Sequence, residues 1–242
     1  IIKCCNQSGL DVEDIVLEPL ASSQAVLSPD EQEVGVVLVD IGGGTTDVTI
    51  YSEGSIVHTS VLALGGNHLT HDIAIGLGAP LREAEDIKHK YGVAMASMVG
   101  EEEMIDVPSV GGRNNRTMQK RVLASIIEDR FREIFELIAH EIEKTHFHTL
   151  MASGVVITGG TCIMSGADRL ASQVLNLPVR VGYPENISGL REMIYSPKYA
   201  TSVGLVRYGI TSNQGKLNFV GDDTNLFHKV SRRMKDWMQD FF

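Results

Sequence analysis

A short apolar run near the start of the chain gives way to three glycines set between acidic and hydroxyl residues. Residues 36–39 are β-branched or aliphatic, as expected of a buried strand, and Asp40 follows them. Glycine permits tight turns, and a turn whose backbone N–H groups converge can bind an anion such as phosphate. Asp40 and Asp47 could hold Mg²⁺ through water or orient an attacking water. We interpret this stretch as a phosphate-binding turn rather than an ordinary hairpin. Its residues are Gly42, Gly43, Gly44, Thr45 and Thr46.

A second glycine loop follows another apolar run much further along the chain. Residues 154–158 predict a buried strand, and Gly159, Gly160 and Thr161 separate it from a predicted helix. Backbone in such a loop can lie against a nucleobase or a phosphate, and two loops at strand ends can face one crevice. Glu18, just before the first glycine motif, is either an exposed end residue or a carboxylate for catalysis or Mg²⁺.

Composition places limits on the class of protein. The 242 residues are 43% hydrophobic and 21% charged, which is typical of a globular chain with a sizeable core. The net charge of -10 argues against a general nucleic-acid binder. Three cysteines, two of them adjacent, favour a reducing compartment over a disulfide framework. The chain does not begin with Met and starts inside a helical pattern, so we expect a fragment.

Periodicity and turn residues predict alternating helices and strands. Helices are expected over residues 1–9, 19–27, 69–77, 80–91, 117–148, 163–175 and 199–209, with a break in the longest near residues 129–130. Strands are expected over residues 14–17, 36–39, 48–51, 56–61, 101–110, 154–158 and 179–182, and a polar turn over residues 28–31.

The end of the chain differs in character from the rest. A polar stretch without periodicity precedes an amphipathic pattern whose other face carries lysine and arginine. An apolar face rich in Met and aromatic residues with basic flanks is typical of a helix lying in a membrane interface. The alternative is a helix docked on its own domain. The predicted membrane-binding residues are Phe227, Val230, Met234, Trp237, Met238 and Phe241.

These motifs resemble those of the actin, heat-shock chaperone and sugar kinase superfamily. Residues 40–47 resemble its second phosphate motif, residues 159–161 its adenosine motif and residues 18–21 its first connecting helix. Within the superfamily the chain is most similar to the FtsA family of bacterial cell-division proteins, on residues 34–51 and on the polar linker with its terminal amphipathic helix. Only the later part of that family is represented, because the family's first phosphate loop and its characteristic inserted subdomain have no counterpart in the sequence. That subdomain is distinct from the small subdomain of the second lobe.

The resemblance implies an α/β fold: an actin-like (ribonuclease-H-like) lobe with a small inserted α/β subdomain and a C-terminal amphipathic helix. The implied parts are the end of the first lobe with its connecting helix at 1–33, the second-lobe core at 34–66 and 151–210, the inserted subdomain at 67–150, a flexible linker at 211–225 and a membrane-targeting helix at 226–242.

The resemblance also implies ATP and Mg²⁺ as cofactors. Residues 42–46 would hold the β- and γ-phosphates, Asp40 would meet Mg²⁺ or water, and residues 159–161 would face the adenosine. Glu85 and Lys88 match a helix that reaches the ribose and base. A basic cluster falls where the family binds the tubulin-like protein FtsZ, and could take its acidic C-terminal tail; a solvated helix start is the alternative. The cluster is Arg113, Arg116, Lys120 and Arg121.

The function expected from the resemblance is assembly. An actin-like ATP-binding protein of this kind would polymerise with itself, bind anionic lipids, tether the FtsZ ring to the membrane and help recruit later division proteins. Its place would be the cytoplasmic face of the bacterial inner membrane at the septum, and it would be at most a slow ATPase. Two alternatives of the same fold remain: a cytoplasmic pilus-assembly adaptor, and a small-molecule kinase.

Overall fold

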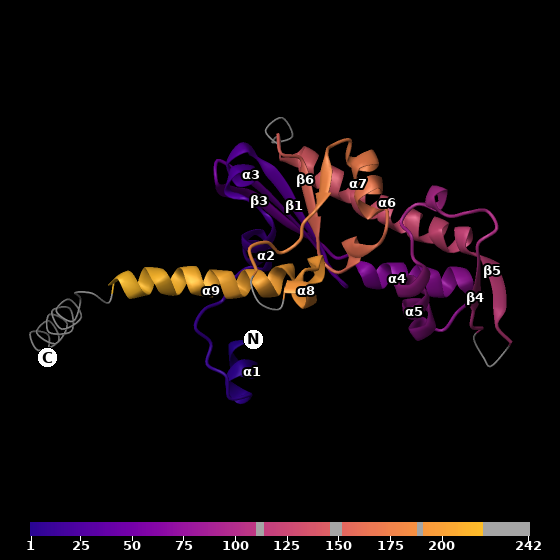
Figure 1. Ribbon diagram of the computed structural model, residues 1–242, viewed down its shortest axis with the longest axis horizontal. Helices are drawn as coiled ribbons and strands as arrows, with labels where there is room; N and C mark the ends of the chain where they lie inside the picture. The colour runs from indigo at the N-terminus through magenta and orange to yellow at the C-terminus, as the bar shows by residue number, and fades with distance from the viewer. Residues whose placement is uncertain (110–113, 146–151, 188–190, 220–242) are drawn as a thin grey trace, which may run out of the picture.

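A computed structural model describes residues 1–109, 114–145, 152–187 and 191–219 (Figure 1). The predicted membrane-binding helix at residues 226–242 and Arg113 of the basic cluster therefore lie outside the described residues. The chain folds as a mixed α/β structure around a five-stranded sheet with the strand order β3-β2-β1-β6-β7. A separate two-stranded sheet joins β4 and β5.

The strand β1 (Val36–Ile41) lies at the centre of the large sheet, and all six of its residues are buried. It pairs antiparallel with β2 (Thr46–Ser52) and parallel with β6 (Val155–Thr158). The outer strands are β3 (Ser55–Leu62), antiparallel to β2, and β7 (Val179–Val181), parallel to β6. A central strand covered on both faces needs a continuous apolar run, which is what residues 36–39 supply.

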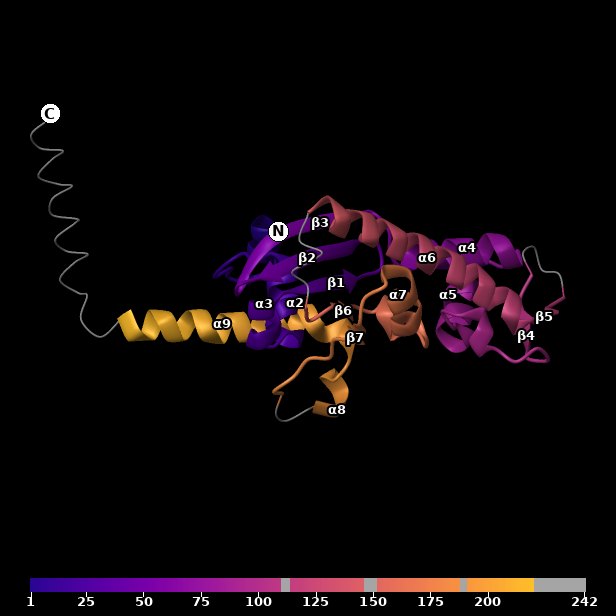
Figure 2. The ribbon, with the colours of Figure 1, turned by 90° about the horizontal axis from the view of Figure 1, so that it is seen from above.

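Alternate residues of β1 enter two different cores. Val37 and Val39 pack with the helices on one face of the sheet, whereas Val36 and Leu38 pack with those on the other. The first face carries α6 (Lys120–Lys144) and α7 (Ala167–Leu175), and the second carries α2 (Glu18–Val26) and α9 (Ala200–Phe219). The short helix α3 (Pro29–Val34) adds no buried residue to either core. Figures 1 and 2 both show α2 beside α9, and α6 contacts α7.

The part between β3 and β6 extends away from the sheet. It contains α4 (Gly66–Leu77), α5 (Leu81–Tyr91), η1 (Ala96–Met98), β4 (Met104–Val107), β5 (Arg116–Gln119) and the long helix α6 (Figure 1). The helix α6 is continuous over 25 residues, so the predicted break at 129–130 is wrong. Arg130 lies within the continuous helix and forms a forked ion pair with Asp72 of α4, with Nε to Oδ2 at 2.5 Å and Nη2 to Oδ1 at 3.1 Å.

The remaining elements are the short α1 (Ile2–Gln7), η3 (Thr161–Ile163), α8 (Arg191–Ile194) and η4 (Pro197–Tyr199). Four further predictions need correction. Residues 117–119, expected at the start of the long helix, belong to β5. Residues 14–17 form no strand, and the predicted turn at 28–31 is the start of α3, because Ser28 and Glu31 cap that helix reciprocally. The helix α9 runs to Phe219, so the linker predicted from residue 211 is helical over its first part.

Candidate functional site

The described residues line a cleft of about 540 Å³ between the large sheet and the α4–α5 pair. Both predicted glycine loops contribute to it, together with the predicted Glu85 and Lys88. Its lining consists of Gly43, Gly66, Asn67, Glu85, Lys88, His89, Gly92, Gly160, Thr161, Ile163, Met164, Ser165 and Lys198. Residues from distant parts of the sequence thus meet at one crevice, which is what the pairing of the loops predicts.

Hydrogen bonds to backbone carbonyl groups lock the hairpin between β1 and β2 in place. The hairpin is closed by the N–H of Gly42 donating to the carbonyl of Thr45 at 2.9 Å. The carbonyl of Gly42 also accepts from the N–H of Gly66 at 2.9 Å and from the hydroxyl of Thr161 at 2.8 Å. The start of α4 and the second glycine loop therefore both hold the first glycine loop, and Thr161 joins the two loops directly.

Space is left above the tip of the hairpin. Gly43 and Gly44 are exposed, and neither has a positive φ. A Cβ built on Gly44 meets no described atom within 4 Å, and one on Gly43 meets only the Asn67 side chain, at 3.5 Å. The ligand-free fold thus does not require glycine at either position, which leaves close approach of a ligand as a physical reason for it.

The two threonines of the motif have different environments. Thr45 is exposed at the hairpin. Thr46 is fully buried, and its hydroxyl donates to the carbonyl of Leu64 at 2.8 Å. Because that hydroxyl is committed inside the fold, we revise the prediction for Thr46 from phosphate binding to support of the hairpin.

The carboxyl group of Asp40 is buried beneath the hairpin, with 5% of the residue exposed. Its Oδ2 accepts a 2.7 Å hydrogen bond from the hydroxyl of Ser22. Burial raises the pKa of Asp40 to about 6; the hydrogen bond from Ser22 opposes this change, and the nearby Glu18 and Asp47 add to it. Near neutral pH the site therefore holds a carboxylate whose negative charge is poorly solvated, and which a cation would stabilise.

Gly159 lies directly against this carboxyl group. Its φ is +92°, and a Cβ built there would lie 2.5 Å from both Oδ1 of Asp40 and the carbonyl oxygen of Ile41. Gly159 thus serves close packing next to Asp40, while Gly160 and Thr161 line the cleft. Among the predicted adenosine-facing residues, only these last two are exposed to the cleft.

The candidate metal ligands come from neighbouring strands. Asp47 lies opposite Asp40 in the register of β1 and β2, and burial followed by the charge of Glu18 raises its pKa. Within the described residues, no group of three or more His, Cys, Asp or Glu side chains is placed to hold a metal ion. Mg²⁺ at Asp40 or Asp47 would consequently need phosphate oxygens and water to complete its coordination.

Lys88 of α5 is held among oxygen atoms next to the start of α4. Its Nζ lies 2.8 Å from Oε2 of Glu85, 2.7 Å from the hydroxyl of Thr70 and 3.0 Å from the carbonyl of Gly66. Burial raises the pKa of Glu85, but hydrogen bonds from Lys88 and Thr70 outweigh it, so the net change is a lowered pKa. Glu85 also pairs with His89 at 2.9 Å. The pair predicted from sequence is thus an ordered polar wall of the cleft.

The lining side chains that were not predicted from the sequence include Asn67, His89 and Lys198. Asn67 follows the Gly65-Gly66 step after β3, so the glycine pair was a usable signal for a third loop at the cleft. His89 lies one residue beyond Lys88 on α5. Lys198 lies in η4, and only the folded chain brings it to the second glycine loop, where its Cβ is 3.7 Å from a Cβ built on Gly160.

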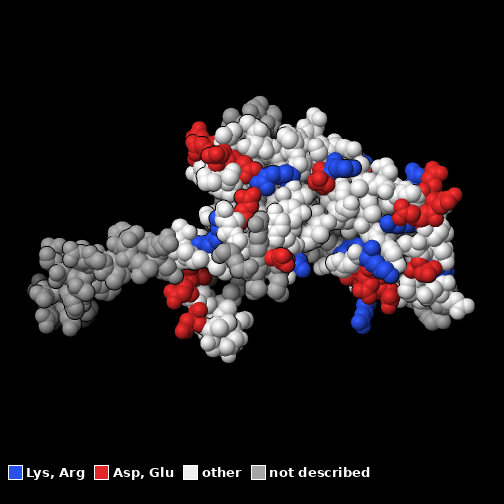
Figure 3. Space-filling view, in the orientation of Figure 1, with Lys and Arg blue, Asp and Glu red and all other residues white. Residues whose placement is uncertain are grey.

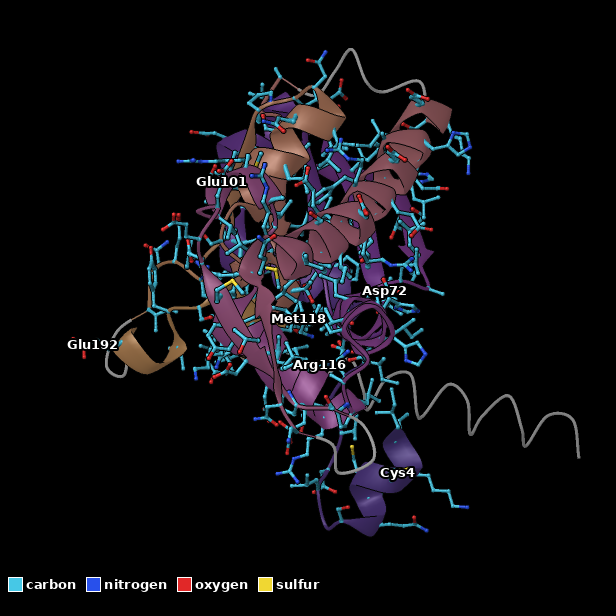
Figure 4. The ribbon with its side chains drawn as sticks, turned by 90° about the vertical axis from the view of Figure 1, so that its right-hand side faces the viewer. Cys4, Asp72, Glu101, Arg116, Met118 and Glu192 are labelled. Carbon is cyan, nitrogen blue, oxygen red and sulfur yellow. The ribbon has the colours of Figure 1, made fainter. Side chains whose placement is uncertain are left out.

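The predicted basic cluster is largely neutralised by contacts within the protein. Lys120 pairs with Glu103 at 2.9 Å and Arg121 with Glu101 at 3.5 Å, while Arg116 donates to the carbonyl of Leu77. Figure 3 shows acidic side chains beside basic ones over this end of the molecule, and Figure 4 shows where Glu101 and Arg116 lie. The described part of the cluster is therefore a mixed-charge surface and not a simple basic patch.

The sheet order and the cleft at its strand ends define the class: an actin-like α/β fold. The structure of MreB5 of Spiroplasma citri bound to ADP matches with a TM-score of 0.71 over 89% of this chain and 65% of that one, at 19% identity. A structure of the PilM-PilN type IV pilus biogenesis complex matches with a TM-score of 0.63 over 85% of this chain and 55% of that one, at 17% identity. At such identities the likeness establishes the fold alone.

The sequence comparison is more specific. The model of the family "Cell division protein FtsA" matches residues 37–204, and the FtsA of Pseudomonas aeruginosa is 41% identical over the whole of this chain. The chain belongs to the FtsA family of cell-division proteins. It spans 59% of the length of that relative. Within the described residues, no helix combines the length and the apolar character needed to cross a membrane.

Proposed function

We propose that the cleft binds ATP with Mg²⁺ and that nucleotide controls the assembly of this division protein. The observation that carries the proposal is the hydrogen bond from Thr161 to the carbonyl of Gly42, which fixes both glycine loops at one cleft. The MreB5 structure, which has the same fold, is described as bound to ADP and supports this choice of ligand.

The proposed roles follow the geometry of the cleft. The backbone of residues 43–45 takes the β- and γ-phosphates, and Gly42, whose N–H is bonded to Thr45, is revised to support of the turn. Gly160 and Thr161 face the adenosine, and Glu85 and Lys88 contact the ribose and base. Mg²⁺ would supply positive charge to the phosphates and polarise them. Asp40 and Asp47 would face that ion through water, and Glu18 is the candidate carboxylate for a slow hydrolytic step.

At the level of the cell, we propose the role expected for an FtsA protein. The chain would polymerise, bind anionic lipids through residues 226–242, connect the tail of FtsZ to the inner membrane at the septum and help recruit later division proteins. The fold alone does not distinguish this role from that of a pilus adaptor or a kinase, because the pilus complex shares it. The match to the FtsA family favours the division role over both.

Substitution of Gly44 by alanine tests the nucleotide site. We expect the affinity for Mg-ATP to fall by about tenfold, equivalent to about 1.4 kcal/mol, because the added methyl group occupies the space left for phosphate. Folding should be unaffected, since a Cβ at Gly44 meets no described atom within 4 Å. Backbone amide NMR shifts during a titration to millimolar Mg-ATP measure even weak binding and locate it.

The matched control is Gly209→Ala in α9, where a Cβ likewise meets no described atom within 4 Å, but far from the cleft. We expect shifts at Gly43, Asn67 and Gly160 in the parent chain and in the control, and weaker shifts in Gly44→Ala. Shifts that avoid the cleft, or equal affinities for all three proteins, would refute the assignment of the phosphate site.

The terminal helix is tested by flotation with vesicles of anionic phospholipid. The chain should float, and Trp237→Glu should remain at the bottom, because a carboxylate in the apolar face is costly to bury. Trp237→Phe, which keeps an aromatic ring, is the control and should float. If a chain ending at Thr224 floats as well as the parent, the tail is not the membrane anchor.

A further inference from the structure

A row of hydrogen bonds connects the buried carboxylate of Asp40 to the surface through two hydroxyl groups. Ser22 of α2 donates to Oδ2 of Asp40 at 2.7 Å, and its oxygen lies 3.0 Å from the hydroxyl of Thr201 at the start of α9. Because the one hydrogen of Ser22 goes to Asp40, Thr201 is the donor to the oxygen of Ser22, and its other possible acceptor, Oε1 of Glu18, is farther away at 3.4 Å. The row thus joins residues 179 positions apart in the sequence, and neither hydroxyl belongs to a recognised motif.

The carboxyl group has contacts on both of its oxygens. Ser22 is fully buried, so no bulk water competes for its hydrogen bond to Oδ2. On the other side, Gly159 packs so closely that a Cβ there would lie 2.5 Å from Oδ1. Asp40 is therefore held in one orientation by a donor on one oxygen and by packing on the other.

The position of Ser22 depends in turn on how closely α2 and α9 approach each other. Gly204 of α9 packs directly on the carbonyl of Ala21, the residue before Ser22, and Arg207 donates to the carbonyl of Gln24 at 2.5 Å. Figures 1 and 2 both show the two helices side by side. The spacing of these helices thus sets the distance between Ser22 and Thr201.

We propose that Ser22 and Thr201 are positioning residues that fix the orientation of the Asp40 carboxylate beneath the phosphate-binding hairpin. Thr201 acts through Ser22, whose single hydroxyl hydrogen is committed to Asp40. The orientation of Asp40 is a property of the ligand-free chain. Its purpose rests on the function proposed above: the oriented carboxylate presents a negative oxygen to the water shell of a cation bound to the phosphates.

The first arm of the test needs no nucleotide. Crystal structures of the parent chain, of Ser22→Ala and of Thr201→Val are compared in the same crystal form. We expect Asp40 to occupy one side-chain orientation in the parent and to rotate or split between two in Ser22→Ala, with a smaller change in Thr201→Val. An unchanged Asp40 in Ser22→Ala would overturn the proposal, whatever the chain binds.

The second arm measures how much Mg²⁺ strengthens ATP binding, by comparing affinities with Mg²⁺ and with EDTA. Loss of an outer-shell partner commonly costs about tenfold or more in metal affinity, and we expect about a tenfold smaller gain from Mg²⁺ in Ser22→Ala. Thr201→Val should reduce the gain and Thr201→Ser should restore it. Thr211→Val makes the same change at an exposed threonine of α9 and should have no effect.

The two arms separate the possible failures. If the parent chain shows no binding of ATP at the cleft, the proposed function fails, and the crystal structures still decide whether the hydroxyls orient Asp40. If ATP binds and the gain from Mg²⁺ is equal in all variants, Ser22 and Thr201 do not position Asp40 for the cation. If Thr201→Val and Thr201→Ser reduced the effect of Mg²⁺ on ATP affinity equally, that result would also contradict a role of the hydroxyl group.

Discussion

Replacing Gly204 by alanine is expected to destabilise the fold by about 2 to 4 kcal/mol, at the upper end of what overpacking usually costs. A Cβ at this position would lie 1.7 Å from the carbonyl oxygen of Ala21, which is backbone and cannot rotate away. The helices α2 and α9 must separate to accommodate it. The loss should outweigh the gain of up to about 1 kcal/mol that alanine brings to a helix interior.

Gly209→Ala provides the matched control in the same helix. A Cβ there meets no described atom within 4 Å, so this variant should be slightly more stable than the parent. Free energies of unfolding from urea titrations measure both variants. Equal stabilities for the two would show that α2 and α9 are not in close contact in solution.

The same substitution should also disturb the nucleotide site. Separation of α2 from α9 lengthens the distance between Ser22 and Thr201, which is 3.0 Å in the parent. We therefore expect any Gly204→Ala protein that remains folded to lose part of the gain from Mg²⁺ in ATP binding. Gly209→Ala should keep that gain in full.

Much of the central sheet and the cleft could be predicted because their signals are local in the sequence. The apolar run of β1 and the glycines after it define a strand and its turn within a few residues. The second glycine loop follows β6 in the same way, and parallel pairing of β1 with β6 then brings both loops to one edge of the sheet.

The errors arose where contacts between distant segments decide the structure. Ser28-Pro29 is typical of a turn, but the capping box with Glu31 and the ion pair from Arg180 to Glu31 turn it into a helix start. Residues 212–219 lack periodicity, yet they continue α9. The roles of Ser22 and Thr201 could not be predicted from the sequence. Their hydroxyl groups lie near Asp40 only because α2 and α9 pack together in the folded chain.

The Asp40→Asn variant is expected to be more stable than the parent at neutral pH by up to about 3 kcal/mol, the free energy equivalent of a pKa raised from 3.8 to about 6. Asn keeps a carbonyl oxygen that can accept the hydrogen bond from Ser22. It removes the buried negative charge and its repulsion with Asp47 and Glu18.

The sign of the pH dependence follows from proton binding. Between 3.8 and about 6 the folded chain retains a proton on Asp40 that the unfolded chain has lost. Unfolding then releases a proton, so the contribution of Asp40 to stability falls as the pH rises through this window and is constant above it. The difference in unfolding free energy between parent and Asp40→Asn should grow from near zero at about pH 4 to its full value above about pH 6.

Urea titrations across this pH range measure the difference directly, and a difference that does not change with pH would contradict a buried, poorly solvated Asp40. Asp40→Asn is thus expected to raise stability but to impair function. In EDTA it should bind ATP as well as the parent, but Mg²⁺ should increase its ATP affinity much less than that of the parent. A chain that keeps a carboxylate at a cost of about 3 kcal/mol is more stable without it, so the charge needs a reason outside folding. The proposed cation on the phosphates of a bound nucleotide would supply that reason, because its positive charge would offset the cost of leaving Asp40 ionised beneath the hairpin.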